Sequence, residues 1–120
     1  MKIKNKVYYC YFIISKNRTY IGITCDLKRI KKHNGLLKGG AKSTRTSKNW
    51  NYHTIVGTFI GKGQAMRFEW YWKHQKNNKG AWIKTKSGLN NKMKRLLDLL
   101  LENEWKHINI IINPKELRSR

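Results

Sequence analysis

The stretch VYYCYFIISKNRTYIGIT, residues 7–24, decides the expected fold of this chain. Its two halves, Val7–Ile14 and Thr19–Thr24, are rich in β-branched and aromatic residues, which favour strands. The short polar segment SKN between them is typical of a turn. The stretch therefore predicts an antiparallel hairpin that places Tyr11 and Tyr20 on adjacent strands.

The rest of the chain predicts a mixture of helices and strands. Asp26 can cap a short basic helix that runs through Leu27 and Ile30 toward His33, and Gly35–Trp50 is expected to be a surface loop because it lacks apolar periodicity. The pattern then predicts a strand Asn51–Ile60, a helix with Ala65, Phe68, Glu69 and Trp72 at helical spacing, an irregular polar segment Asn77–Gly88, an amphipathic helix through Met93, Leu96, Leu97, Leu100 and Leu101, and a strand His107–Ile112.

These elements predict an α/β (α+β) fold in one domain. A chain of 120 residues has the length of a single domain with one modest core. We expect a central three-stranded antiparallel sheet flanked by helices, in a core spanning about residues 6–76. An additional C-terminal helix and strand are expected at about residues 89–113.

The composition points to a polyanionic partner. The chain carries 27 Lys and Arg against 6 Asp and Glu, a formal net charge of +21, which a folded domain normally tolerates when it binds nucleic acid. A hydrophobic content of 39% is too high for a disordered basic tail. An acidic membrane surface is the weaker alternative, because no segment pairs a basic face with a long apolar face.

The two cysteines indicate a reduced, intracellular environment. Cys10 and Cys25 lie in predicted strands without C-x-x-C spacing or a neighbouring His/Cys cluster, so neither a structural zinc site nor a disulfide framework is expected. No apolar stretch approaches the roughly 20 residues needed to span a bilayer. We therefore expect a protein of the nucleus or cytoplasm, including a viral or host compartment that holds DNA, and no membrane partner.

The short basic helix carries two residues that can act on a phosphate. Arg29 and His33 are four positions apart and share one helix face, where the guanidinium can hold phosphate oxygens while the imidazole exchanges a proton. The same element holds further charge at Lys28, Lys31 and Lys32. Spacing alone also fits a solvated basic helix whose histidine caps or packs.

Glu69 is a candidate metal ligand. It is one of only 6 acidic residues and lies among aromatic residues on a helix expected to be half buried, where a carboxylate needs a cation. A hard divalent ion, Mg²⁺ or Mn²⁺, suits one carboxylate that acts together with substrate phosphate. The alternative is an ion pair with Arg67, Lys73 or another base, and the residues leave both possibilities open.

Two further groups of cations are candidate phosphate contacts. The predicted loop contributes Lys38, Lys42, Arg45 and Lys48, with Trp50 at its end expected to be structural. A second basic surface, suited to another duplex arm, is expected from Lys84, Lys86, Lys92, Lys94 and Arg95. Because phosphate contacts position a duplex without reading its sequence, we expect recognition of branch or flap geometry.

Tyr11 and Tyr20 gain significance from the motifs around them, since strand tyrosines at period-two spacing ordinarily only pack. The chain resembles the GIY-YIG nuclease superfamily in five motifs, namely Tyr9-Cys10-Tyr11, Tyr20-Ile21-Gly22, Asp26-Leu27-Lys28-Arg29, His33-Asn34-Gly35 and Phe68-Glu69-Trp70. It is similar to the Slx branch, the catalytic subunits of structure-selective DNA endonucleases, in Gly39-Gly40-Ala41, the Arg45 and Trp50 pair, Phe68–His74, and the leucine-rich helix followed by Trp105 and Ile108–Ile112.

The resemblance implies a role for each matching residue. Tyr11 would activate or orient the attacking water, with Tyr20 supporting it from the next strand. Arg29 would bind the scissile phosphate, His33 would assist proton transfer or phosphate positioning, and Glu69 would hold a single divalent metal. Cleavage of flaps, forks or Holliday junctions would leave a 5′ phosphate and a 3′ hydroxyl. A free tyrosine, with a pKa of about 10, is a poor base, so the site must activate it.

Two departures from the family pattern limit these expectations. The first motif reads Tyr-Cys-Tyr rather than Gly-Ile-Tyr, which changes packing more than chemistry because Tyr11 is kept. Slx subunits usually continue into a cysteine-rich, RING-like zinc domain that contacts a scaffold protein, and two cysteines cannot form one. Two other functions remain as alternatives to a structure-selective endonuclease. One is a non-catalytic nucleic-acid-binding module, and the other is a homing or restriction-type nuclease of the same superfamily.

Overall fold

Four antiparallel strands form the central sheet, in the order β2–β1–β3–β6. The computed structural model describes residues 6–16, 18–27 and 50–112. Its elements are β1 (Val7–Ser15), β2 (Arg18–Thr24), β3 (Asn51–Ile60), α3 (Lys62–Lys73), β4 (His74–Lys76), β5 (Trp82–Lys84), α4 (Leu89–Leu100), a short 3-10 helix η1 (Asn103–Trp105) and β6 (Asn109–Ile112). The mixed α/β class predicted from the sequence is confirmed.

The predicted hairpin is the centre of the sheet. β1 pairs with β2 in a register that places Tyr11 opposite Gly22 and Ile13 opposite Tyr20. On its other side β1 pairs with β3, and β6 then pairs with β3. The C-terminal strand therefore extends the three predicted strands to four. It begins at Asn109 rather than at His107, which lies in a turn.

The alternation of β1 divides its side chains between two buried clusters. Cys10 and Phe12 point toward the helices and belong to the larger core cluster, whereas Tyr11 and Ile13 belong to a second cluster that includes Trp50. Successive strand residues face opposite sides of a sheet, so the two clusters lie on opposite faces. We call them the helix face and the tyrosine face. Trp50 is buried, as the structural role predicted for it requires.

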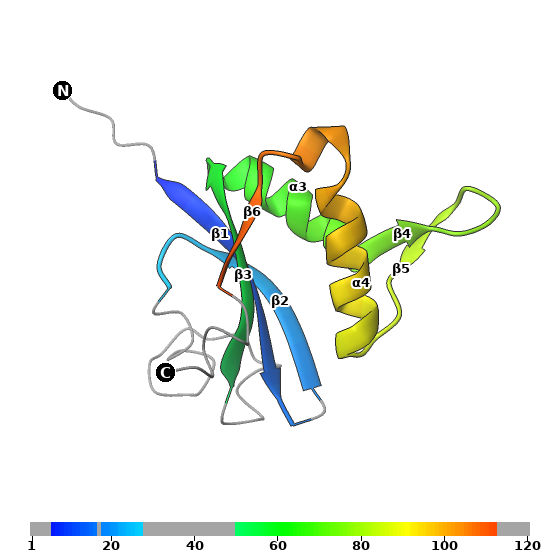
Figure 1. Cartoon of the computed structure of the whole chain (residues 1–120), viewed down its shortest axis with the longest axis horizontal. Helices are drawn as coiled ribbons and strands as arrows, with labels where there is room; N and C mark the ends of the chain where they lie inside the picture. Colours follow the sequence, from blue (N-terminus) through cyan, green and yellow to red (C-terminus); the bar gives the residue numbers. More distant parts are fainter. Residues whose placement is uncertain (1–5, 17, 28–49, 113–120) are drawn as a thin grey trace.

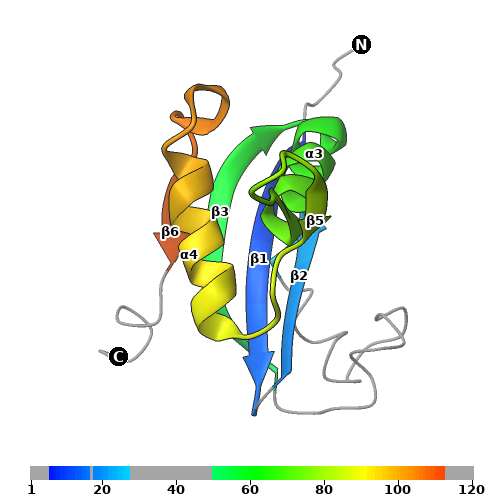
Figure 2. The same cartoon turned by 90° about the vertical axis from the view of Figure 1, so that its right-hand side faces the viewer.

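Both long helices cover the helix face of the sheet (Figure 1). Figure 2, turned by 90°, shows α3 in front of β1 and α4 beside β3. Phe68 and Trp72 of α3 pack with Leu96 and Leu99 of α4 in one cluster. The indole Nε1 of Trp72 donates a hydrogen bond to the carbonyl oxygen of Lys92 at 2.8 Å, which joins the two helices. None of the helices in the described part of the chain is long and apolar enough to cross a membrane.

The segment after α3 is more regular than the sequence suggested. The expectation of an irregular Asn77–Gly88 is wrong over Trp82–Lys84, which forms β5 and pairs with β4 in a small hairpin projecting from the body (Figure 1). The turn is built locally, because the side chain of Asn77 accepts hydrogen bonds from the backbone N–H groups of Lys79 and Ala81, both at 2.9 Å. Gly80 adopts a φ of +81° there, which favours glycine.

Candidate active site

The two motif tyrosines lie together on the tyrosine face. Tyr11 is 1% exposed, and its ring centroid lies 6.3 Å from that of Tyr20 on the edge strand β2. Tyr52 of β3 contacts Tyr11 edge-on, with centroids 6.0 Å apart, and its hydroxyl donates a hydrogen bond to the carbonyl oxygen of Leu27. The predicted placement of the two tyrosines on adjacent strands is confirmed. The sequence interpretation did not include Tyr52 among the residues around Tyr11, although its position in the predicted strand Asn51–Ile60 could have indicated that it faces the same side of the sheet.

Gly22, which pairs with Tyr11 across the two strands, leaves the space that the Tyr11 hydroxyl occupies. A Cβ atom at Gly22 would lie 2.5 Å from the hydroxyl oxygen of Tyr11 and 3.0 Å from a ring carbon of Tyr20. Contacts this short force a neighbour to move, so any larger residue would displace the tyrosine pair. The glycine of the second motif is therefore required by close packing across the two paired strands.

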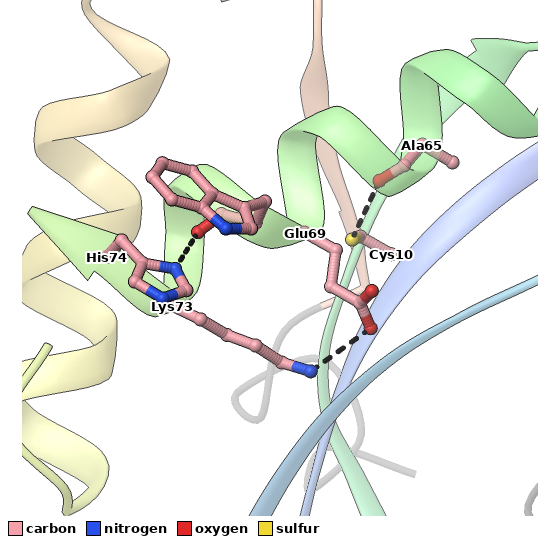
Figure 3. A network of polar contacts seen from close by, with 6 residues as sticks. Cys10, Ala65, Glu69, Lys73 and His74 are labelled. Carbon is pink, nitrogen blue, oxygen red and sulfur yellow. Dashed lines mark hydrogen bonds and ion pairs between the residues drawn. The ribbon is translucent and has the colours of Figure 1, made fainter. Parts of the chain in front are cut away.

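Glu69 lies on α3, on the side of the helix that faces the sheet edge. Its carboxylate forms an ion pair with Lys73, with Nζ and Oε2 3.3 Å apart and side chains 39% and 23% exposed for Lys73 and Glu69. Figure 3 shows the Lys73 ammonium turned toward the carboxylate, with Cys10 on the neighbouring strand. Of the two bases that the sequence analysis considered as partners of Glu69, Lys73 is the one that pairs with it. Arg67 instead pairs with Glu104, with Nε and Oε2 2.6 Å apart.

Lys73 connects the carboxylate to the tyrosines. Its Nζ atom lies 5.9 Å from the centroid of the Tyr20 ring, a cation–π contact, while it also pairs with Glu69. Because β2 is the edge strand, Tyr20 can pack with Tyr11 and still meet Lys73 at the rim of the sheet. The structure thus joins Tyr11, Tyr20 and Glu69 through Lys73, a linking role that the sequence interpretation did not assign to it.

Cys10, beside Glu69, has no role as a nucleophile. Burial raises the pKa of the Cys10 thiol well above its ordinary value, and the negative charge of Glu69 raises it further while Lys73 lowers it. The thiol is therefore neutral at physiological pH and acts as a small core residue that contacts the carbonyl oxygen of Ala65. Cys25 lies just after β2 rather than in it, and both cysteines are free.

The donor set around Glu69 fits a hard divalent cation. Among residues 6–16, 18–27 and 50–112, no group of three His, Cys, Asp or Glu side chains is placed to hold a metal ion. Glu69 offers one partly buried carboxylate whose charge is already balanced by a cation. Mg²⁺ binds through one or two carboxylates, waters and substrate phosphates, so a single such carboxylate suits it.

The other predicted site residues fall outside the described part of the chain. These are the catalytic candidates Arg29 and His33 and the candidate DNA contacts Lys28, Lys31, Lys32, Lys38, Lys42, Arg45 and Lys48. The proposed cap Asp26 is described, and its N–H donates a hydrogen bond to the Thr24 hydroxyl at 2.9 Å. The helix expected to follow lies beyond these residues.

One member of the predicted second basic surface is structural. The Nε atom of Arg95 donates hydrogen bonds to the carbonyl oxygens of Tyr71 at 2.9 Å and His74 at 2.8 Å. Its side chain is 10% exposed and lies 3.8 Å from Glu102. Assigning Arg95 to a DNA-contacting surface is therefore wrong, because its guanidinium is used to join α4 to the end of α3.

A comparison with known protein families finds one family whose pattern matches most of this chain. The family described as the GIY-YIG catalytic domain matches residues 7–90, a range that runs from the start of β1 into α4. The match therefore includes the strands that carry Tyr11 and Tyr20 and the helix that carries Glu69.

Curated relatives match the same region. A protein of Cryptosporidium parvum named structure-specific endonuclease subunit SLX1 homolog is 34% identical over 137 residues, covering 93% of this chain and 33% of the relative. The structure-specific endonuclease subunit SLX1 of Malassezia globosa is 43% identical, over 57% of this chain and 16% of the relative. The structure-specific endonuclease subunit slx1 of Schizosaccharomyces japonicus is 38% identical, over 60% of this chain and 28% of the relative. The chain spans a third or less of the length of these relatives.

Proposed function

Because the chain belongs to the GIY-YIG family, we propose that it is a metal-dependent, structure-selective DNA endonuclease. The observation that supports the proposal is a chain of contacts that runs from the two strand tyrosines to a helix carboxylate by way of Lys73. Tyr11 and Tyr20 lie 6.3 Å apart by ring centroid, and Lys73 bridges from Tyr20 to Glu69.

The chain's own residues would divide the hydrolysis of a phosphodiester among them. A water oxygen bonds to phosphorus while the bond to the 3′ oxygen breaks, leaving a 5′ phosphate and a 3′ hydroxyl. We assign orientation of the water to Tyr11, which packs against Gly22 and Tyr20, and its ionised form, the tyrosinate, would accept the proton of the water. Arg29 would hold the phosphate oxygens and stabilise their growing charge, and His33 would return a proton to the leaving oxygen.

Glu69 would hold the divalent cation, Mg²⁺ or Mn²⁺. When bound, such an ion supplies Lewis-acid stabilisation of the negative charge that develops on the phosphate. Lys73 would have to release the carboxylate first, since the two are 3.3 Å apart in this structure. Until substrate and cation arrive, the Lys73 ammonium balances the charge of this carboxylate.

Branched DNA is the substrate we propose, with a scaffold protein as a possible partner. The names of the relatives describe structure-specific endonuclease subunits, and a chain of net charge +21 with several cationic groups can contact more than one duplex arm. Such an enzyme would act in the nucleus or cytoplasm, wherever its DNA is held.

The decisive test is a panel of labelled flaps, replication forks, four-way junctions and linear duplexes of matched sequence. We expect incision of the branched substrates in Mg²⁺ or Mn²⁺, no incision in EDTA, and products with 5′ phosphates. Equal cutting of every substrate would defeat the structure-selective part of the proposal. Cutting of linear duplex at one sequence would indicate a homing or restriction-type enzyme, and salt-sensitive binding without cutting would indicate a non-catalytic module.

A further inference from the structure

A cavity lined by lysines lies next to the candidate active site. It has a volume of about 260 Å³ and is bounded by β2, the end of α3, the start of β4, the residues closing β5 and the first turn of α4. Its walls include Lys73, Lys84 and Lys92 together with Tyr20 and Thr85. A water molecule occupies about 30 Å³ of liquid, so a phosphate group with some of its hydration fits this volume.

The charge in the cavity is one-sided. Lys73, Lys84, Lys92 and His74 are among the residues that line it, and no Asp or Glu is among the described residues that do so, although Lys73 also pairs with Glu69 outside the lining. Burial lowers the pKa of Lys92, and the positive charges of Lys73 and Lys84 lower it further. Lys92 is therefore repelled by Lys73 and Lys84, and an anion bound between the three lysines would relieve that repulsion.

The walls of the cavity are held in place by hydrogen bonds between its elements. The backbone N–H of Thr85 donates to the carbonyl oxygen of Lys73 at 2.9 Å, and its hydroxyl donates to that of Trp72 at 3.2 Å. Trp72 in turn holds the backbone of Lys92, whose Nζ donates to the carbonyl oxygen of Thr85 at 3.4 Å. A site held in advance loses less free energy when a ligand binds.

We propose that this cavity is a phosphate-binding subsite that takes a backbone phosphate of DNA beside the bond that is cut. The proposal rests on the proposed nuclease function and adds a substrate contact to it. Tyr20 and Lys73 line the cavity and also belong to the candidate active site, so the two positions adjoin. Lysine binds phosphate as a point charge and needs no fixed planar geometry.

Sharing Lys73 has a consequence for the metal site. A phosphate in the cavity attracts the ammonium group that otherwise pairs with Glu69 at 3.3 Å. Binding of the DNA phosphate would then free the carboxylate for a divalent cation, and linkage requires the cation to favour phosphate binding in return. The subsite would couple the arrival of DNA to the completion of the catalytic site.

The first arm of the test uses inorganic phosphate at constant ionic strength, followed by NMR shifts of the Ile21 and Thr85 amides. We expect saturable shifts in the wild type and a weakening of about tenfold in the double variant Lys84→Gln, Lys92→Gln. Lys84→Gln alone removes the charge of an exposed side chain, and this single variant replaces the double variant in the test if the double variant fails to fold. The control Lys106→Gln removes one positive charge, as Lys84→Gln does, from an exposed turn beyond η1 and leaves the affinity unchanged.

The second arm measures the salt dependence of branched-DNA binding in EDTA, where no cleavage interferes. The slope of log K against log salt is negative, and loss of one phosphate contact makes it shallower by about 0.9, which we expect for the double variant and not for Lys106→Gln. Phosphate shifts that are the same in the variants would overturn the subsite, and an unchanged salt slope would overturn its assignment to DNA. If wild-type protein cuts no DNA while both arms hold, the proposed nuclease function fails and the subsite stands.

Discussion

The two faces of the sheet are both buried, yet they are built from different chemistry. On the helix face Phe12, Phe68, Trp72 and Leu96 pack as an apolar core. On the tyrosine face the hydroxyl-bearing rings of Tyr11, Tyr20 and Tyr52 gather around the same central strands. β1 contributes alternate residues to each, so one strand supports stability on one side and candidate chemistry on the other.

Glu69 lies at the boundary between the two regions. Its helix belongs to the helix face, but its carboxylate meets Lys73, which reaches Tyr20 at the edge strand. The comparison predicts that substitutions on the helix face change mainly the free energy of unfolding. Substitutions on the tyrosine face and at Glu69 should change mainly the rate of cleavage.

The largest effect on stability is expected in α4. Leu96→Ala removes a fully buried side chain, 0% exposed, and should lower the free energy of unfolding by about 2–5 kcal/mol. The neighbouring Leu97 is 54% exposed, so Leu97→Ala should stay within about 0.5 kcal/mol of the wild type. Urea denaturation measures both. Equal costs for the two leucines would contradict the packing of α4 described above.

Gly22→Ala tests the tyrosine face directly. The added methyl group meets the Tyr11 hydroxyl at 2.5 Å, so we expect a loss of about 1–3 kcal/mol in stability together with loss of cleavage. Gly63→Ala is the matched control, because its Cβ meets nothing within 4 Å and lies in α3. That substitution should stabilise the protein by about 0.4–1 kcal/mol and leave cleavage intact. Full activity in Gly22→Ala would show that the position of Tyr11 is unimportant.

Tyr11→Phe separates chemistry from packing on the same face. Removing the hydroxyl keeps the ring against Tyr20, so stability should fall by less than about 1.5 kcal/mol while the single-turnover rate falls about 100-fold. Tyr8→Phe changes a tyrosine that packs on the helix-face cluster and should leave the rate unchanged. The assignment fails if both variants cut DNA at the wild-type rate.

The smallest effect concerns alkaline pH and Cys10. Because the folded-state pKa of the Cys10 thiol is raised, its contribution to stability is complete below the unfolded-state pKa of about 8.5 and is lost as pH rises toward the folded value. Melting temperatures between pH 7 and 10 should therefore fall more steeply for the wild type than for Cys10→Val. Cys25→Ser, at an exposed position, should follow the wild type. Parallel curves for wild type and Cys10→Val would show that the buried thiol does not ionise on unfolding.

The sequence predicted the hairpin and the helix position of Glu69 because both follow from local periodicity. It also held the information that selects Lys73 over Arg67 as the ion-pair partner. Lys73 is four positions from Glu69 and shares its helix face, whereas Arg67 is two positions away and points elsewhere, toward Glu104. That distinction was available from helix geometry alone.

Other features depend on tertiary contacts that local patterns do not encode. β4 and β5 have three residues each, too short to show an alternating pattern, and their pairing depends on the turn at Asn77 and Gly80. Arg95 resembles its basic neighbours in sequence but is used to join two elements. The lysine-lined cavity combines residues from five elements, so no single segment of the sequence predicts it.

The most direct test of the account compares Glu69→Gln with Glu104→Gln. Both substitutions remove one carboxylate charge from a side chain that pairs with a base. The base that pairs with Glu69 is Lys73, which also contacts the ring of Tyr20, whereas Glu104 pairs with Arg67. Single-turnover cleavage of a labelled flap in Mg²⁺ is measured alongside melting temperature and DNA affinity. We predict that Glu69→Gln binds DNA, remains folded and loses cleavage by about 100-fold or more, while Glu104→Gln cuts normally. Wild-type cleavage by Glu69→Gln would contradict the central claim.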